Sequence, residues 1–261
     1  MRYLKRLLQY IYSIYGFAIF LFFMFLLLPL IIGASFFGKV RGGNAVYKIC
    51  AFWADAGLFC WGMHHENIYE QVPDPKSPAV FVFNHISYID IPILMLTFRK
   101  YRVRILAKAE ISKVPVFGFI YKTATVMVDR SDSQNREESV KTLKSLLRRN
   151  ISVVIAPEGT FNMTGNPLKE FYDGAFRIAI ETGIPVKPVL FLDAFDRLSY
   201  KSIFSLSPGR SRSVFLEEIC VKDFKPEEVK ELKQKVYERM EAGLIKYKAS
   251  WISKKHNGRC E

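Results

Sequence analysis

The distribution of apolar residues divides the chain into two regions. Between Arg6 and Lys39 no residue is charged, and a stretch of this length exceeds the roughly 20 apolar residues that a helix needs to cross a bilayer. From residue 79 onward, short apolar runs alternate with longer amphipathic segments and loops. This pattern predicts a membrane-embedded helical motif at the N-terminus, followed by a domain built from strands and helices.

Six apolar runs in the second region have the length and composition of buried strands. They cover residues 79–83, 103–107, 124–128, 151–156, 186–191 and 214–221. Residues 135–149 predict an amphipathic helix with Val140, Leu143 and Leu147 on one face, and a last helix begins near Pro226. Strands that alternate with helices predict a single α/β domain with a mixed, mostly parallel sheet flanked by helices.

The N-terminal apolar segment has basic residues on both sides, which weakens a simple rule for its orientation. This arrangement favours a segment that enters one leaflet and returns, with Pro29 and Gly33 allowing a bend, although a full span remains the alternative. Residues 45–63 predict a second helix at the membrane interface. The expected organisation is a membrane-anchoring segment at residues 1–65, an α/β domain at residues 66–252 and a basic tail at residues 253–261.

Charge and cysteine content narrow the set of partners and compartments. The chain has 38 Lys and Arg against 25 Asp and Glu, a formal net charge of +13 that favours anionic partners. The apolar segment favours membrane lipids and phosphate-bearing substrates over nucleic acid. Four cysteines without paired spacing are typical of reduced thiols that face the cytoplasm. We therefore expect the domain on the cytoplasmic face of the inner (cytoplasmic) membrane, and no metal site.

Polar residues follow the first predicted strand. Asn84, His85, Ser87 and Asp90 come directly after residues 79–83, at the edge of the sheet where open α/β sheets bind ligands. Four residues separate His85 from Asp90, and a turn from strand to helix brings two such side chains together. A neutral imidazole takes a proton from an alcohol, and a carboxylate on its other nitrogen fixes the tautomer and stabilises the imidazolium.

A structural alternative is that Asn84 and Asp90 only cap the helix that begins near Ile91. Three further stretches bear on this choice. They are residues 108–118 with a strand that ends at Asp129-Arg130, the stretch Pro157-Glu158-Gly159-Thr160, and residues 184–189. With the His85 and Asp90 spacing, these ordered blocks resemble the four blocks of the glycerolipid acyltransferases of the 1-acylglycerol-3-phosphate acyltransferase type, over about residues 79–191.

This resemblance implies an activity and a set of site residues. It implies a general base at His85 with Asp90 as its orienting partner, an acyl donor that is a thioester of coenzyme A or acyl carrier protein, and a lysophospholipid acceptor. The first expected acceptor is 1-acylglycerol-3-phosphate, acylated in phospholipid biosynthesis without a cofactor. The expected substrate-binding residues are Asn84, Ser87, Lys108, Arg130, Glu158, Gly159 and Thr160. Taken alone, Lys108 and Arg130 are equally consistent with surface charges. Residues 158–160 alone are equally consistent with a plain turn.

Two positions depart from the family pattern. Phe161 stands where the family usually has Arg, and Tyr172 stands where it commonly has Lys. In one hypothesis, Lys108 and Arg130, with Lys169 as a third candidate cation, still hold a phosphate monoester. In the other, the acceptor is a lysolipid that lacks this group. A membrane lipid-binding scaffold without turnover is the non-enzymatic alternative, and the sequence leaves the donor, the chain length and the oligomeric state open.

Overall fold

The computed structural model describes residues 2–129 and 132–252, so Arg130 and the predicted tail lie outside the described residues. One sheet holds seven strands in the order β1-β7-β6-β2-β5-β3-β4. The strands are β1 (Met63–Tyr69), β2 (Val80–Phe83), β3 (Val103–Lys108), β4 (Thr125–Val128), β5 (Ser152–Ile155), β6 (Val186–Phe191) and β7 (Gly209–Phe215). From β6 to β4 all neighbours are parallel, whereas β7 is antiparallel to β6 and parallel to β1.

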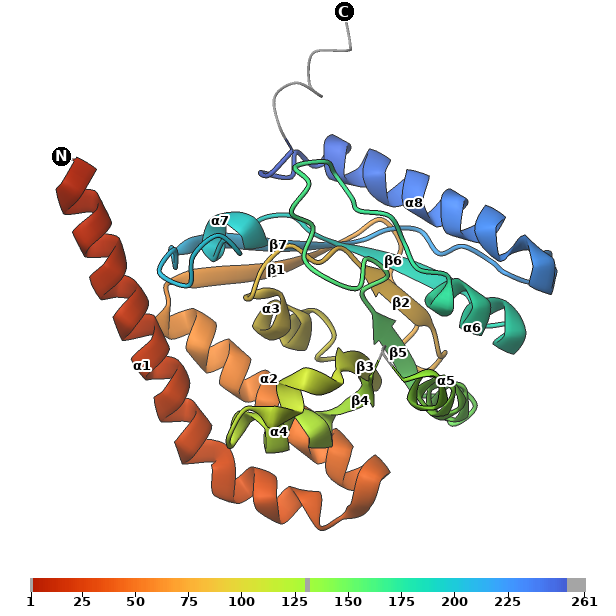
Figure 1. The fold of residues 1–261 in the computed structure, drawn as a ribbon, viewed down its shortest axis with the longest axis horizontal. Coiled ribbons are helices and arrows are strands. Elements are labelled where there is room, and N and C mark those ends of the chain that lie inside the picture. Colours follow the sequence, from red (N-terminus) through yellow and green to blue (C-terminus); the bar gives the residue numbers. More distant parts are fainter. Residues whose placement is uncertain (1, 130–131, 253–261) are drawn as a thin grey trace, which may run out of the picture.

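Helices cover both faces of this sheet (Figure 1). The α-helices are α1 (Arg2–Ser35), α2 (Gly43–Cys60), α3 (Asp90–Thr97), α4 (Phe117–Ala124), α5 (Ser133–Leu147), α6 (Gly174–Thr182), α7 (Ala194–Arg197) and α8 (Val229–Lys246). Short helical turns are η1 (Gly38–Gly42, a π-helix), η2 (Ala109–Lys113) and η3 (Pro226–Glu228). Helices α5, α6 and α8 pack in one layer, and α2, α3 and α4 pack in the other with α1 outside them (Figure 1). The architecture is the mixed α/β fold that the sequence predicts.

The central strands β2, β5 and β6 correspond to apolar runs in the sequence. Every residue of β2, β5 and β6 is buried, because helices cover both faces of these parallel strands. A strand buried on both sides is a continuous apolar run, which is the pattern that predicted them. The carboxyl ends of β2 and β6 lie side by side, so residues that follow them meet at one edge of the sheet.

The strands β1 and β7, at one side of the sheet, correct the predictions. The strand β1 was not predicted, so the sheet begins at Met63 and not after residue 65. The strand predicted at residues 214–221 is β7 at Gly209–Phe215, and Ile219 makes only an isolated bridge to Val186. Both strands carry many polar residues, and most of β1 and part of β7 are not fully buried, so neither strand is a continuous apolar run.

The N-terminal helices form a hairpin. Helix α1 continues through Pro29 to Ser35, bends toward its C-terminal end (Figure 1), and the chain then reverses at residues 36–42. Helix α2 returns along α1, with the Phe20 and Trp53 rings 4.7 Å apart. In the described chain, residues Tyr3–Ser35 are one helix that is long and apolar enough to cross a membrane.

Candidate active site

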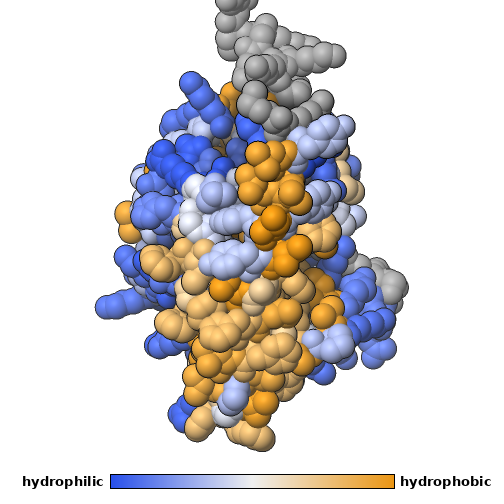
Figure 2. All heavy atoms as spheres, turned by 90° about the vertical axis from the view of Figure 1, so that its left-hand side faces the viewer, coloured by the Kyte–Doolittle hydropathy of each residue, from blue (hydrophilic) through white to orange (hydrophobic). Residues whose placement is uncertain are grey.

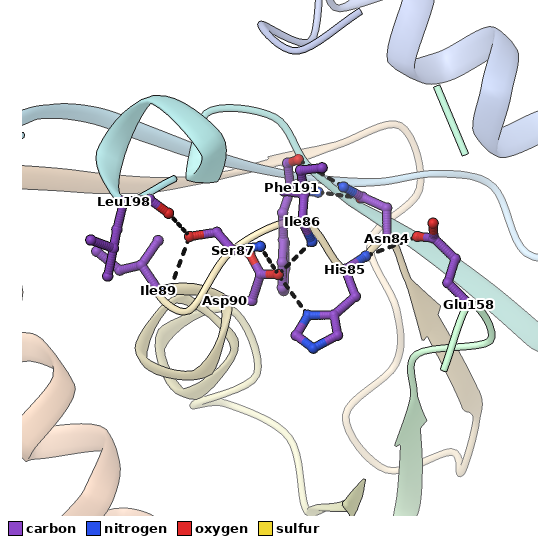
Figure 3. Close-up of polar contacts among 9 residues, drawn as sticks. All are labelled: Asn84, His85, Ile86, Ser87, Ile89, Asp90, Glu158, Phe191 and Leu198. Carbon is purple, nitrogen blue, oxygen red and sulfur yellow. Dashed lines mark hydrogen bonds and ion pairs between the residues drawn. The ribbon is translucent and has the colours of Figure 1, made fainter. Parts of the chain in front are cut away.

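The turn after β2 is fixed to the neighbouring strand by Asn84. Its side-chain Nδ2 donates to the carbonyl of Phe191 at 3.0 Å, and the Phe191 amide donates to Asn84 Oδ1 at 2.8 Å. Phe191 ends β6, so the buried amide of Asn84 links the ends of β2 and β6 directly before His85 (Figure 3). Both hydrogen-bonding ends of the Asn84 side chain are used within the protein.

His85 and Asp90 form the pair that the sequence predicts. The Nδ1 atom of His85 lies 2.7 Å from Asp90 Oδ2, and the backbone amides of Ile86 and Ser87 donate to the same oxygen at 2.8 and 2.9 Å. Asp90 is 1% exposed, whereas the His85 side chain is 24% exposed. Two backbone amides already donate to Oδ2, and a His85 ring with its hydrogen on Nδ1 donates to the same oxygen and leaves Nε2 as a proton acceptor. The second ring nitrogen points away from Asp90 (Figure 3).

Ser87 stabilises the same turn through hydrogen bonds. Its hydroxyl donates to the carbonyl of Leu198 and accepts from the Ile89 amide at 3.1 Å, and its side chain is fully buried. These bonds hold residues 85–90 compact against the segment that follows β6. Both hydrogen-bond partners of the hydroxyl lie within the protein. Binding of substrate by Ser87 stays a prediction.

Glu158 supports His85 from the opposite side. One carboxyl oxygen accepts from the His85 amide at 2.9 Å, and the other accepts from the Lys169 amide at 2.9 Å. Burial raises the pKa of Glu158 to about 8, against the two backbone donors, which lower it. The next residue, Gly159, has a φ of +71°, a left-handed conformation that favours glycine. Thr160 then accepts a hydrogen bond from Lys169 Nζ at 2.8 Å.

A cavity of about 740 Å³ opens beside His85. Its walls come from α1, α2, α3 and α4 and are mostly apolar, including Phe20 and Trp53. His85, Lys108 and Thr160 line it as well, so a few polar groups meet an apolar chamber of the size typical for ligand sites. Among the described residues, Asn84 and Glu158 do not line this cavity and instead hold its wall in place.

Phe161 occupies a place that the sequence did not reveal. Its ring contacts the His85 imidazole with 4.5 Å between centroids and the Tyr88 ring with 4.9 Å. The Asn162 amide donates to the His85 carbonyl at 2.8 Å, so this loop is bound to the turn that carries His85 and Asp90. Tyr172 is 60% exposed and does not line the cavity. Only the Phe161 departure from the family pattern therefore lies at the candidate base.

Comparison with known protein families shows which family the chain belongs to. Residues 63–192, about half of the chain, match the family model described as Acyltransferase. The chain belongs to the acyltransferase family. The matched region runs from β1 to the end of β6 and contains His85, Asp90 and Glu158. The resemblance inferred from four short blocks is thereby confirmed.

Similar proteins share a description and a fold. The chain is 30% identical over 145 residues to the chloroplast 1-acyl-sn-glycerol-3-phosphate acyltransferase of Brassica napus, covering 55% of this chain and 41% of that protein. It is 29% identical over 156 residues to the 1-acyl-sn-glycerol-3-phosphate acyltransferase of Haemophilus influenzae, covering 58% and 63%. The chain thus spans less than half the length of the Brassica relative.

A solved structure extends the likeness to the whole fold. The crystal structure of the 1-acyl-sn-glycerophosphate (LPA) acyltransferase PlsC from Thermotoga maritima superposes with a TM-score of 0.71. The superposition covers 96% of this chain and 99% of that chain at 23% sequence identity. The N-terminal hairpin is therefore part of the shared fold, not an addition to it.

Proposed function

We propose that the protein transfers a fatty acyl group from an acyl thioester to the free hydroxyl of 1-acylglycerol-3-phosphate, giving phosphatidic acid. The observation that carries this proposal is the His85 and Asp90 pair, 2.7 Å apart, at the wall of a large apolar cavity. The names of the similar proteins from Brassica napus and Haemophilus influenzae support 1-acylglycerol-3-phosphate as the acceptor. Coenzyme A and acyl carrier protein are both compatible donors.

The chemistry follows from the tautomer of His85. Nε2 takes the proton of the acceptor hydroxyl as its oxygen attacks the thioester carbonyl carbon, and a tetrahedral oxyanion forms. Asp90 stabilises the imidazolium through the Nδ1 hydrogen bond. The carbon–sulfur bond then breaks, and the leaving thiolate takes the proton from Nε2. No enzyme nucleophile is needed, because the substrate hydroxyl attacks directly.

We assign binding of the acceptor phosphate to two cations. Lys108 ends β3 and lines the cavity, and Arg130, which lies outside the described residues, comes two positions after the end of β4 in the sequence. Both strands end at the same edge of the sheet as β2. Thr160 and Gly159 belong to the same cavity wall and complete the proposed acceptor site.

Membrane attachment is assigned to the α1–α2 hairpin. Large apolar side chains of α1 are exposed, for example Phe25 and Leu26 at 56% and 55%, and α1 also lines the cavity. Figure 2 shows that apolar surface predominates over the lower half of this face. We place this face in the inner membrane with the α/β domain on its cytoplasmic side, so that lipid acceptors enter from the bilayer.

The decisive experiment is product analysis by mass spectrometry with His85→Ala. Removal of a general base is expected to lower kcat by roughly 10²- to 10⁴-fold. His64→Ala, which changes an exposed histidine on β1, is the matched control and should keep full activity. A His85→Ala protein with wild-type turnover would instead support the scaffold hypothesis.

A second acceptor class is favoured by one observation, the contact of Phe161 with His85. An aromatic ring offers no donor to a phosphate, so a lysolipid without a phosphate monoester is the alternative acceptor. A charge-assisted hydrogen bond contributes roughly 1.5 to 3 kcal/mol, or about one to two decades in affinity. The Phe161→Arg variant should therefore lower KM for 1-acylglycerol-3-phosphate by about tenfold or more, because it supplies donors to the phosphate that Phe161 lacks. Equal use of phosphate-free lysolipids by the wild type would replace our first choice.

A further inference from the structure

The segment between α7 and β7, residues 198–208, joins helix α1 to the catalytic turn, and we name it the connector loop. Toward the active site, Ser87 donates its hydroxyl hydrogen to the Leu198 carbonyl and forms an isolated antiparallel bridge with Ser199. Toward α1, the Leu206 amide donates to Ser13 Oγ at 3.2 Å. The connector loop is thus bonded at one end to the residues that hold Asp90 and at the other end to the N-terminal helix.

The tip of the connector loop is apolar and exposed. Ile203 is 63% exposed and Phe204 is 41% exposed, and the Phe204 ring lies 5.3 Å from the ring of Tyr10 on α1. Leu7 and Ile14 on the same helix are exposed at 56% and 60%. The apolar surface of α1 therefore continues onto the connector loop. Soluble monomers rarely leave a continuous apolar surface of this kind uncovered, so it indicates a partner.

The same tip forms the rim of the active-site cavity. Ile203 and Leu206 line the cavity together with His85, although Ile203 is largely exposed. Ser13 and Phe17 of α1 line the cavity next to them. An exposed residue that also lines a cavity lies at its opening, so a lipid that enters here passes between α1 and the connector loop.

Positive charge beside this apolar tip indicates what covers it. Lys201 of the connector loop is exposed, and so are Lys5 and Arg6 in the second turn of α1. Apolar side chains next to basic ones are typical of surfaces that lie at the boundary between lipid headgroups and acyl chains. An apolar contact with another protein gives no reason for these three exposed cations.

We propose that the connector loop is a second bilayer-contacting element, with Phe204 and Ile203 inserted at the acyl boundary and Lys201 against lipid phosphates. The proposal rests on the membrane attachment of α1 given above. Since the connector loop is bonded to Ser87, its seating on the lipid also determines how the opening beside His85 faces the bilayer. The depth of Phe204 is expected to be shallow, because Tyr10 lies close to the basic N-terminal end of α1.

The first test measures contact with lipid directly. An environment-sensitive fluorophore is attached to Phe204→Cys, Leu26→Cys or Val72→Cys in full-length protein with Cys60, Cys220 and Cys260 changed to Ser, and vesicles of phosphatidylcholine and phosphatidylglycerol are added. Val72 is 72% exposed and follows the carboxyl end of β1, whereas the connector loop precedes the amino end of the parallel neighbour β7. We expect blue-shifted emission and quenching by headgroup spin labels at position 204, quenching by acyl-chain labels at position 26, and no change at position 72.

Two outcomes of this test would overturn the proposal. One is a response at position 26 with none at position 204, which would restrict lipid contact to α1. The other is a shift at position 204 that depends on protein concentration without lipid, which would identify a second copy of the chain as the partner. Neither outcome depends on acyl transfer, so the proposed activity can fail while this contact is still measured.

The second test separates lipid contact from folding of the site. The double variant Lys201→Glu with Phe204→Asp is compared with a control variant, Val72→Asp with Lys76→Glu, which also replaces an exposed apolar residue and a lysine by acids but in the segment between β1 and β2. Acyl transfer is measured on vesicle-embedded acceptor and on a short-chain acceptor below its micelle concentration. We expect about a tenfold loss for the first variant on vesicles only, with the control variant unchanged. Equal losses in both assays would show a merely structural role and overturn the proposal.

Discussion

Asp90 is held in place by burial and by several contacts to one carboxyl oxygen. Its Oδ2 accepts from the His85 ring and from two backbone amides, while Oδ1 is buried without a hydrogen-bond partner among the described residues. In Asp90→Asn the amide oxygen can still accept the backbone bonds, but the imidazolium loses its counter-charge. We expect kcat to fall by roughly 10²- to 10⁴-fold with KM nearly unchanged.

The control for the kinetics of Asp90→Asn is a substitution of an acidic residue outside the site. Asp55→Asn changes an exposed carboxylate of α2 and should retain wild-type kcat. If Asp90→Asn raised KM and left kcat intact, Asp90 would act in substrate binding and not on the base.

Glu158 gives a pH dependence of stability. Its ordinary pKa is 4.5 and burial raises it to about 8, so between these values the folded state keeps a proton that the unfolded state releases. The unfolding free energy therefore falls as pH rises from about 4.5 to about 8, by at most about 1.4 kcal/mol per pH unit. In Glu158→Gln this part of the slope should disappear, which denaturant unfolding at several pH values measures.

The Gln variant also tests the hydrogen bonds of Glu158. Its amide nitrogen must face the amide of His85 or of Lys169, so one accepted bond is lost at a cost of about 1 kcal/mol. The neighbouring exposed acid provides the control, because Glu170→Gln should leave the slope as in wild type. An unchanged slope in Glu158→Gln would assign the pH dependence to other groups.

The candidate site was partly predictable at this scale. Spacing and position after a strand were enough to find His85 and Asp90, because a short turn leaves few ways to arrange them. The tertiary contact of Phe161 with His85 joins residues 76 positions apart in the sequence, which no local pattern encodes. The bonds of Asn84 to Phe191 and of the His85 amide to Glu158 likewise depend on how strands align.

At the scale of elements, strands were predictable where both faces are covered. The buried runs of β2, β5 and β6 have one pattern whatever their neighbours are. The edge strand β1 contains His64, His65, Glu66 and Asn67, and its pairing with β7 joins Met63 to Gly209. Its stability comes from a partner far along the chain, so the local sequence gives no strand signal.

Helix packing predicts opposite effects for two glycines. A Cβ at Gly118 of α4 would lie 2.2 Å from the backbone carbonyl oxygen of Ser112, whereas one at Gly174 of α6 would have no neighbour within 4 Å. We expect Gly118→Ala to lower the unfolding free energy by about 1 to 3 kcal/mol, because backbone must move. Gly174→Ala should be neutral or stabilise by up to about 1 kcal/mol through helix propensity.

Thermal unfolding of these two variants provides the measurement, and each acts as the control of the other. Both remove one glycine and add one methyl group, so the unfolded chains change equally. Similar melting temperatures for the pair would show that η2 and α4 shift apart at little cost, contrary to the close packing of Gly118 on Ser112.

At the scale of the whole molecule, net charge and apolar surface make separable contributions to membrane binding. The formal charge of +13 attracts acidic lipids, whereas the exposed apolar face of α1 binds any bilayer. Each cation near an acidic surface contributes about 1 kcal/mol at ordinary ionic strength. Binding to phosphatidylglycerol vesicles should therefore exceed binding to phosphatidylcholine vesicles by about tenfold or more.

Salt distinguishes the two contributions. The screening length falls from about 10 Å at 0.1 M to about 3 Å at 1 M, so high salt should reduce binding to acidic vesicles to the level of neutral ones. The remaining binding should respond to Phe25→Asp with Leu26→Asp on α1, because burial of these exposed side chains does not depend on ionic strength. Complete release from acidic vesicles at high salt would mean that α1 stays outside the acyl region. The opening beside His85 would then face the headgroups, and the acceptor would have to leave the bilayer before its hydroxyl met the base.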